Sequence, residues 1–306
     1  MKPAAGARVR AQAKVNLFLR ILAREDDGYH QIETLFCRIA LADVVTVVPE
    51  PSGRHLECSG ESVPVSGLGP PEQNLAWRAA VSYADLTGFP AGFRITIEKR
   101  IPVAAGLGGG SADAGAVLRA LNALNPTPLG QPALLQLAES LGADVPFLTQ
   151  EESPLALAWG RGDRMAALPV LPASTVWLLV PDIGVNSRDA YRWFDEDGGP
   201  SGSSVITRAQ LGTWPGVAAV AANDFEDSVG RRIPLIGRLL EALRTEEFRK
   251  LLGPGGTVVM SGSGSTIAIV SGQPRAPHAG ALPAFAGVKL IETETASFVE
   301  PVVLTH

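Results

Sequence analysis

Residues 102–113 read P-V-A-A-G-L-G-G-G-S-A-D, and the chain continues from there into a pattern typical of a helix. Glycine fills four of the five positions 106–110, which lets the backbone adopt positive φ angles and approach a ligand closely. Behind the glycines, apolar residues recur at helical spacing, at Val117, Leu121 and Leu124. Consecutive amides at the start of a helix, together with the positive end of its dipole, bind anions. The stretch therefore predicts a phosphate-binding loop in preference to a flexible turn.

Two widespread phosphate-binding patterns do not account for this loop. The Walker pattern requires a lysine directly after the glycines, and none stands there. The dinucleotide fingerprint G-x-G-x-x-G/A places Ser111 or Asp113 where its last small residue belongs. Several strand-like segments also precede the loop, whereas a dinucleotide-binding unit opens with strand, loop and helix. A nicotinamide-dependent oxidoreductase is therefore the weaker alternative.

Composition narrows the class of protein. The 306 residues carry 26 Lys and Arg against 31 Asp and Glu, a net charge of −5, and 46% of them are hydrophobic. Such a chain can bury a sizeable core, and it lacks the basic footprint of a general nucleic-acid binder. Two cysteines, Cys37 and Cys58, are too few for a disulfide framework or a four-cysteine zinc site. No stretch of about 20 apolar residues predicts a membrane span, and we expect a cytoplasmic protein.

Strands and helices follow one another without a regular βαβ rhythm, which favours an α+β fold. Up to residue 160 the patterns predict a helix over 74–86, opened by Asn74 and ended by Gly88, a helix over 132–141, and strands over 9–22, 32–39, 43–48 and 93–98. Beyond it they predict strands over 175–180, 257–260, 267–270 and 287–292, helices over 188–194 and 234–252, and loops over 195–204 and 271–286. A change of texture near residues 150–175 divides the chain into two lobes, residues 1–160 and 161–306.

Further short motifs flank the glycine loop. A-K-V-N-L stands at 13–17 and S-G-S-G-S at 261–265, and three others read D-G-Y-H at 27–30, G-A-D-V-P-F at 142–147 and N-D-F-E at 223–226. With G-L-G-G-G-S, these motifs resemble those of the GHMP kinase superfamily and, within it, the branch that phosphorylates 4-diphosphocytidyl-2-C-methyl-D-erythritol in the non-mevalonate isoprenoid pathway. The resemblance spans about residues 10–270. It implies a two-lobed α+β fold, with a ribosomal-protein-S5-like N-terminal lobe and a ferredoxin-like C-terminal lobe.

The resemblance implies roles for residues at and near the loop. Phosphoryl transfer from ATP with Mg²⁺ would use Asp144 as base and Lys14 as its electrostatic partner. The nucleotide-binding residues that it implies are Pro102, Val103, Ala104, Ala105, Gly106, Leu107, Gly108, Gly109, Gly110, Ser111 and Ala112. Lys99 stands just before the loop, where it either reaches the nucleotide or is a solvated charge at the end of a strand. The protein ligands of the metal are left open, with the Ser111 hydroxyl as one candidate. Asp113 is expected in the first helical turn, where its charge suits the helix dipole.

A second group of residues is implied for the acceptor, a small molecule that contains a cytidine diphosphate group. Tyr29 would stack on the cytosine and His30 would offer directional hydrogen bonds. Asn16, on the same face of an alternating strand as Lys14, would bind the alcohol that is phosphorylated. Residues 185–188, V-N-S-R, stand where many relatives have a Ser-Thr pair, so this part of the acceptor pocket is not predicted. Oligomeric state is not predicted either.

Two other functions within the superfamily compete with this interpretation. A GHMP kinase that acts on homoserine or mevalonate would share the glycine loop, but the D-G-Y-H motif speaks against it. A catalytically silent relative would bind ligands without turnover. The presence of both Lys14 and Asp144 favours an active enzyme.

Overall fold

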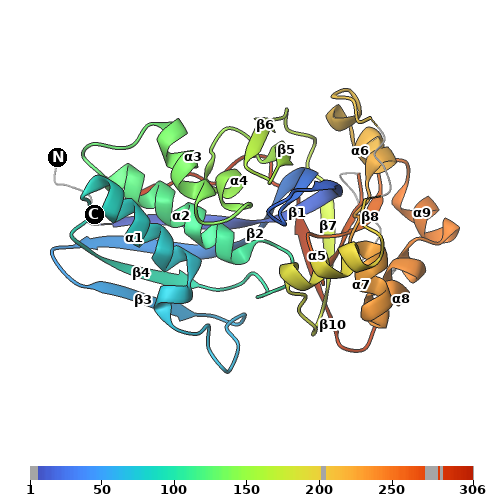
Figure 1. Cartoon of the computed structure of the whole chain (residues 1–306), viewed down its shortest axis with the longest axis horizontal. Helices are drawn as coiled ribbons and strands as arrows, with labels where there is room; N and C mark the ends of the chain where they lie inside the picture. Colours follow the sequence, from blue (N-terminus) through green and yellow to red (C-terminus); the bar gives the residue numbers. More distant parts are fainter. Residues whose placement is uncertain (1–5, 201–204, 273–281, 283–284, 306) are drawn as a thin grey trace.

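The computed structural model describes residues 6–200, 205–272, 282 and 285–305. It contains two β-sheets with helices packed against them, so the predicted α+β class is confirmed. Figure 1 shows the first sheet and its helices on the left of the molecule and the second sheet and its helices on the right.

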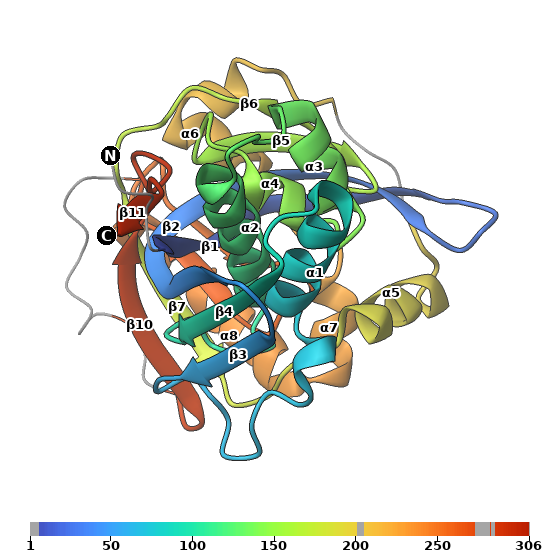
Figure 2. The ribbon, with the colours of Figure 1, turned by 90° about the vertical axis from the view of Figure 1, so that its left-hand side faces the viewer.

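The first sheet is built mainly from the N-terminal half of the chain. Its strands are β1 (Gly6–Arg24), β2 (His30–Glu50), β3 (Arg54–Ser59), β4 (Gly92–Glu98), β5 (Leu155–Gly160), β6 (Arg164–Ala167) and β11 (Val303–Thr305). Within the described residues their order is β11-β1-β2-β4-β3, with β5 paired to β2 and β6 to β5. The helices of this lobe are α1 (Leu75–Thr87), α2 (Gly109–Leu124), α3 (Gln131–Glu139) and α4 (Val145–Thr149). Helix α2 packs directly against β1 and β2, and α1, α3 and α4 gather around it (Figure 2).

The second sheet has the order β10-β7-β9-β8. Its strands are β7 (Thr175–Pro181), β8 (Thr257–Met260), β9 (Ile267–Val270) and β10 (Val288–Glu294), and the helices are α5 (Ser187–Glu196), α6 (Trp214–Val220), α7 (Glu226–Arg232), α8 (Pro234–Leu243) and α9 (Glu246–Leu252). Strand β7 is buried on both faces. Val176 and Leu178 join the core of the first lobe, whereas Trp177 and Leu179 join the core beneath α7 and α8. A continuous apolar strand is the expected sequence for such a position.

Residues 32–39 and 43–48 form the single strand β2, not the two strands predicted. The register against β1 shifts between the pairs Gln12–Ala42 and Lys14–Arg38, so the interruption that the sequence shows is a bulge. The two halves of β2 have different neighbours, because Ile32–Cys37 pairs with β5 and Val44–Glu50 pairs with β4.

Several short elements are not predicted by the sequence patterns: α4, α6, α7, β5, β6 and β11. The predicted loop 195–204 begins inside α5, which continues to Glu196, and its residues 201–204 lie outside the described part of the chain. Residues 273–281 and 283–284 of the predicted loop 271–286 lie outside it as well.

Two strands beyond residue 160 belong to the first sheet. Strand β6 pairs with β5, and β11 pairs with the start of β1 through Arg8 and Val303. The division of the chain into two lobes at residue 160 stays a prediction. Strands β6 and β11 lie beyond residue 160 but pair with strands of the first sheet. The backbone amide of Ala296 also donates to the carbonyl oxygen of Arg38 at 2.9 Å, which fastens the C-terminal segment to β2.

Candidate active site

Two adjoining cavities form the candidate site, and the first of them lies against the glycine loop. The first has a volume of about 540 Å³ and is lined by residues of the glycine loop and of flanking motifs, among them Lys14, Gly108, Ser111, Asp144 and Gly262. The second has a volume of about 1200 Å³ and is lined by residues of the D-G-Y-H segment and of α5, among them Tyr29, His30 and Arg188. Ala143 and Tyr191 line both cavities, so the two form a continuous site.

The glycine loop ends in the N-terminus of α2. Gly108 is the N-cap residue and has φ 70°, which is the left-handed region where glycine is favoured. The helix starts at Gly109, so the amides of Gly109, Gly110 and Ser111 have no carbonyl partner within the helix. These residues line the first cavity, and the arrangement supplies donors and a positive dipole end for an anion.

The S-G-S-G-S loop packs against the glycine loop. Ser261 Oγ donates to the carbonyl oxygen of Gly106 at 3.0 Å, and a Cβ added to Gly106 would lie 2.2 Å from the Ser261 carbonyl oxygen. Only glycine permits this approach. Asn223, from the N-D-F-E segment, donates through Nδ2 to the carbonyl oxygens of Met260 and Gly262 at 2.7 Å each. Asn223 thereby fixes the shape of the S-G-S-G-S loop.

Lys14 and Asp144 meet at the floor of the first cavity. Lys14 Nζ lies 3.2 Å from Asp144 Oδ2 and donates to Asn16 Oδ1 at 2.6 Å. The Lys14 side chain is 4% exposed and that of Asp144 is 31% exposed, so the carboxylate faces the opening. The Lys14 amide donates to the carbonyl oxygen of Leu107 at 3.0 Å. Strand β1 therefore holds Lys14 directly against the glycine loop.

The sequence predicts that Asn16 binds the acceptor alcohol, but in the structure its side chain contacts Lys14 and Thr34. Its Oδ1 accepts from Lys14, and its Nδ2 donates to Thr34 Oγ1 at 2.8 Å. Asn16 is 2% exposed, although it lines the first cavity. It orients the Lys14 ammonium group in this structure, and its contact with the alcohol stays a prediction.

Lys99 lies beneath the glycine loop between two carboxylates. Its Nζ donates to Asp113 Oδ2 at 2.6 Å and also contacts Asp43 Oδ2. The other oxygen of Asp43 accepts from the amides of Arg100 and Ile101, at 2.6 Å and 2.8 Å. The cluster therefore ties the chain that enters the glycine loop to the helix that leaves it.

The sequence predicts Asp113 as a charge that interacts with the helix dipole. In the structure Asp113 is instead 2% exposed and shares the Lys99 ammonium group with Asp43. Burial, with the Asp43 carboxylate as a further cause, raises the pKa of Asp113 to about 8 against the opposing effect of Lys99. Desolvation lowers the pKa of Lys99, but the two carboxylates outweigh it and the pKa of Lys99 is raised. Two carboxylates that share one ammonium group retain a proton between them.

We predict that Asp113→Asn is tolerated and that Asp43→Asn is not. The folded state keeps the Asp113 proton up to about pH 8, whereas the unfolded state releases it near pH 4, so wild-type stability falls as the pH rises between these values. This loss should reach about 2 kcal/mol between pH 6 and pH 8 and should be absent in Asp113→Asn. Asp43→Asn should cost about 1–3 kcal/mol, because the second oxygen of Asp43 accepts from the Arg100 and Ile101 amides while the first contacts Lys99, and an asparagine amide has one oxygen for all three donors. Urea unfolding at both pH values measures these effects, and equal pH slopes for Asp113→Asn and wild type would contradict the assignment.

The second cavity has an aromatic wall. The His30 ring stacks on that of Tyr191 with centroids 4.5 Å apart, and His30 Nε2 lies 2.8 Å from Asp195 Oδ1. Tyr29 is 59% exposed, and the Arg161 guanidinium group covers one face of its ring at 4.1 Å. The structure thus brings Tyr29 and His30 together in a cavity that adjoins the one containing Lys14 and Asp144.

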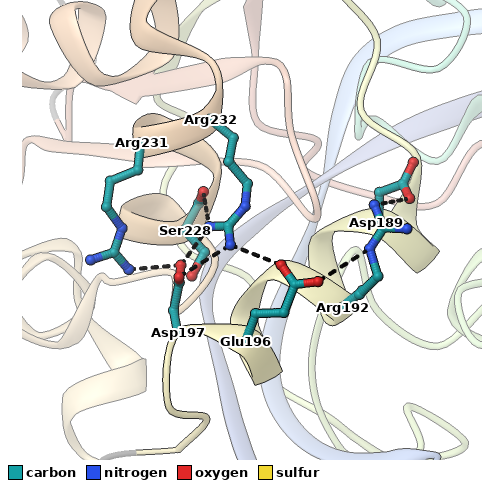
Figure 3. Close-up of polar contacts among 7 residues, drawn as sticks. All are labelled: Asp189, Arg192, Glu196, Asp197, Ser228, Arg231 and Arg232. Atoms are coloured by element: carbon teal, nitrogen blue, oxygen red, sulfur yellow. Dashed lines mark hydrogen bonds and ion pairs between the residues drawn. The ribbon is translucent and has the colours of Figure 1, made fainter.

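Helix α5 forms part of this wall and is fastened at both ends. Ser187 Oγ lies 3.0 Å from Ser263 Oγ at its start. At its end, Asp197 accepts from Arg231 and Arg232, at 2.7 Å and 2.6 Å, which joins α5 to α7 (Figure 3). Exposed ion pairs contribute little individually, but a network of them holds the orientation of a helix better than a single pair.

Several residues of the site are not predicted from the sequence, among them Asp43, Tyr191 and Asn223. Asn223 belongs to the N-D-F-E motif, for which the sequence indicates no role. Asp43 is a charged residue within a predicted strand, which is a signal for a buried partner. Tyr191 lies in a predicted helix, and no local pattern connects it with His30.

Comparison with known proteins identifies the class. The family of the GHMP kinases N terminal domain matches residues 74–151, which contain the glycine loop. The chain is 38% identical over 265 residues to the 4-diphosphocytidyl-2-C-methyl-D-erythritol kinase of Moorella thermoacetica, across 84% of this chain and 87% of the relative. It is 36% identical over 257 residues to the enzyme of that name from Deinococcus radiodurans, across 84% and 81%.

Solved structures agree with this result. A crystal structure of 4-(cytidine 5'-diphospho)-2C-methyl-D-erythritol kinase superposes with a TM-score of 0.72 and 34% identity, across 95% of this chain and 99% of that one. A mevalonate kinase structure superposes with a TM-score of 0.59 at 10% identity, which shows the shared fold alone. Fold and site together define an ATP-dependent small-molecule kinase of the GHMP superfamily. Within it, the chain belongs to the family of 4-diphosphocytidyl-2-C-methyl-D-erythritol kinases.

No helix in the described parts of the chain combines the length and the apolar character that a membrane crossing requires. The cytoplasmic location stays a prediction.

Proposed function

We propose that the protein transfers the γ-phosphoryl group of ATP to the 2-hydroxyl group of 4-diphosphocytidyl-2-C-methyl-D-erythritol, a step of the non-mevalonate isoprenoid pathway. The observation that carries this proposal is the Lys14–Asp144 pair, 3.2 Å apart, in a cavity that contains a helix N-terminus and adjoins an aromatic pocket. The family to which the chain belongs supports the same reaction.

The nucleotide would lie along the glycine loop. Its phosphates would accept from the first-turn amides of α2, while residues 102–107 shape the wall of the first cavity. Lys99 would act through the loop, because its ammonium group already has two carboxylate partners. A Cβ on Gly109 would lie 3.6 Å from Lys99 Nζ, so the ammonium group lies close to the first turn of α2, where the phosphates would bind.

The residues of the first cavity fit a magnesium ion that the nucleotide carries. The described residues contain no group of three or more His, Cys, Asp or Glu side chains that could hold a metal on their own. Mg²⁺ in nucleotide sites is usually held by phosphate oxygens, waters and one or two protein oxygens. The Ser111 hydroxyl group, in the first turn of α2, is such an oxygen. The ion would neutralise charge on the β- and γ-phosphates.

Asp144 would take the proton of the acceptor hydroxyl as its oxygen attacks the γ-phosphorus and the bond to ADP breaks. An ammonium group has three donors. Lys14 uses one on Asn16 and one on Asp144, which leaves one for the transferring phosphoryl group. Because Lys14 is almost completely buried, its charge acts through a low dielectric and stabilises the developing negative charge strongly.

The cytosine would enter the second cavity between aromatic side chains. Arg161 covers one face of Tyr29, which leaves the other face for a base. Burial raises the pKa of Tyr191 to about 12, with the Asp144 charge as a further cause, so its ring stays neutral and suited to stacking. Base stacking on aromatic side chains contributes about 1–3 kcal/mol.

The test is the release of ADP by the purified protein with three acceptors: the cytidine-bearing alcohol, homoserine and mevalonate. We expect turnover with the first and less than about one per cent of it with the others, because neither fills the second cavity. Phosphorylation of homoserine or mevalonate at a comparable kcat/KM would refute the proposal in favour of another kinase of the superfamily.

A further inference from the structure

The charges in the second cavity are unevenly compensated. Among the described residues that line it, four are arginines and none is a lysine. Arg24 lies 3.4 Å from Asp195, and Arg161 contacts both Glu25 and Asp27. Each of these cations therefore has a carboxylate partner.

The third arginine is paired as well, and the fourth is not. Arg192 lies 2.9 Å from Asp189 and 3.7 Å from Glu196 (Figure 3). The side chain of Arg188 has no hydrogen-bond or ion-pair partner among the residues that the structure describes. The cavity thus presents one uncompensated guanidinium group beside its aromatic wall.

Arg188 lines the second cavity on the end of α5 that also reaches the first. Its neighbour Ser187 lines the first cavity, Arg188 lines the second, and Tyr191, one helical turn further on, lines both. Ser187 also contacts Ser263 of the S-G-S-G-S loop at 3.0 Å, so this end of α5 is fixed beside the phosphate-binding region. A ligand that spans the two cavities passes Tyr191, which lies one helical turn from Arg188.

We propose that Arg188 binds the diphosphate group of the acceptor and selects for acceptors that carry one. This inference rests on the proposed function, in which the base lies in the second cavity and the alcohol in the first, so that the diphosphate lies between them. A guanidinium group presents paired donors that match phosphate oxygens, and it stays charged at every physiological pH. The sequence segment 185–188, which the family resemblance left without a role, acquires one in this way.

The test compares cytidine with cytidine diphosphate as probes. Calorimetry gives the dissociation constants of both for the wild type, for Arg188→Gln and for Arg188→Lys. We expect Arg188→Gln to weaken binding of the diphosphate about 10-fold and to change cytidine binding less than about 2-fold. Arg188→Lys should recover part of the loss. In turnover assays the KM of the acceptor should rise by a similar factor, with kcat and the KM of ATP little changed.

Arg249→Gln is the matched control, because Arg249 is an exposed arginine of α9 that lines neither cavity. Its removal changes the net charge equally and should leave both dissociation constants unaltered. Unchanged diphosphate binding in Arg188→Gln, or an equal loss for cytidine and its diphosphate, would overturn the role of Arg188. A wild-type protein that binds neither probe would overturn the proposed function together with this inference.

Discussion

Asp144→Asn should lower kcat about 1000-fold, within the range by which a positioned base accelerates proton transfer. The substitution preserves the size of the side chain but removes its capacity to accept the hydroxyl proton. It also removes the carboxylate that lies 3.2 Å from the buried Lys14 ammonium group. Without this partner the ammonium group keeps only its hydrogen bond to Asn16, so its position at the reacting phosphoryl group is less well fixed. Both effects act on the transition state.

Nucleotide binding should change less than about threefold in the same variant, because the first-turn amides of α2 supply the phosphate donors, whereas Asp144 contacts Lys14. Single-turnover kinetics and ATP titration separate the two quantities. Asp85→Asn is the control, since Asp85 is an exposed carboxylate of α1 that pairs with Arg54 at 3.6 Å. If Asp144→Asn kept more than about a tenth of wild-type kcat, Asp144 would not be the base.

The parts of the fold that the sequence predicts are those with local causes. Helix α1 begins where the Asn74 side chain accepts from the Ala76 amide at 2.9 Å, and it ends at Gly88 with φ 72°. Both residues are visible in the sequence as a cap and a stop. Strands β8 and β9 have the predicted bounds. Each is a short apolar run, and the small residues of S-G-S-G-S between them mark where one strand ends and the next begins.

The parts that escape prediction depend on distant contacts. Strand β11 has three residues and exists because Gly6–Arg8 offers it an edge to pair with. Helix α4 has five residues, too few for local stability, and Arg38 holds its end by donating to the carbonyl oxygens of Phe147 and Gln150 at 2.7 Å and 2.9 Å. No pattern in residues 145–149 contains that information.

The same distinction applies to the site. The motifs identify Lys14, Asp144 and the glycine loop, because each stands in a short recognisable segment. The sequence does not show that Asp43 and Asp113 share the ammonium group of Lys99, since the three residues come from β2, α2 and the end of β4. The sequence also gives Arg188 no role. Arg188 stands out only in the structure, where the other three arginines that line the second cavity each have a carboxylate partner.

Gly108→Val should reduce turnover by at least about 100-fold, since displacement of a catalytic group by about 1 Å can have an effect of that size. Gly108 has φ 70°, and a Cβ at this position would lie 3.0 Å from both Cγ and Cε of Lys14. Valine adds two methyl groups beyond that Cβ. The Lys14 side chain must then move, and its ammonium group leaves both Asn16 and Asp144. ATP should bind more weakly as well, because Gly108 precedes the amides that face the phosphates.

Backbone strain alone would also impair a variant at this position, and Gly88→Val separates strain from collision. Gly88 has φ 72° and ψ 6°, close to the φ 70° and ψ 21° of Gly108, but an added Cβ would have no neighbour within 4 Å. Both variants should lose about 1–2 kcal/mol of stability from the left-handed backbone. Only Gly108→Val should lose turnover in the folded protein. If the two variants had equal kcat, the glycine at 108 would serve the backbone alone, and the close approach between the glycine loop and Lys14 would have no part in phosphoryl transfer.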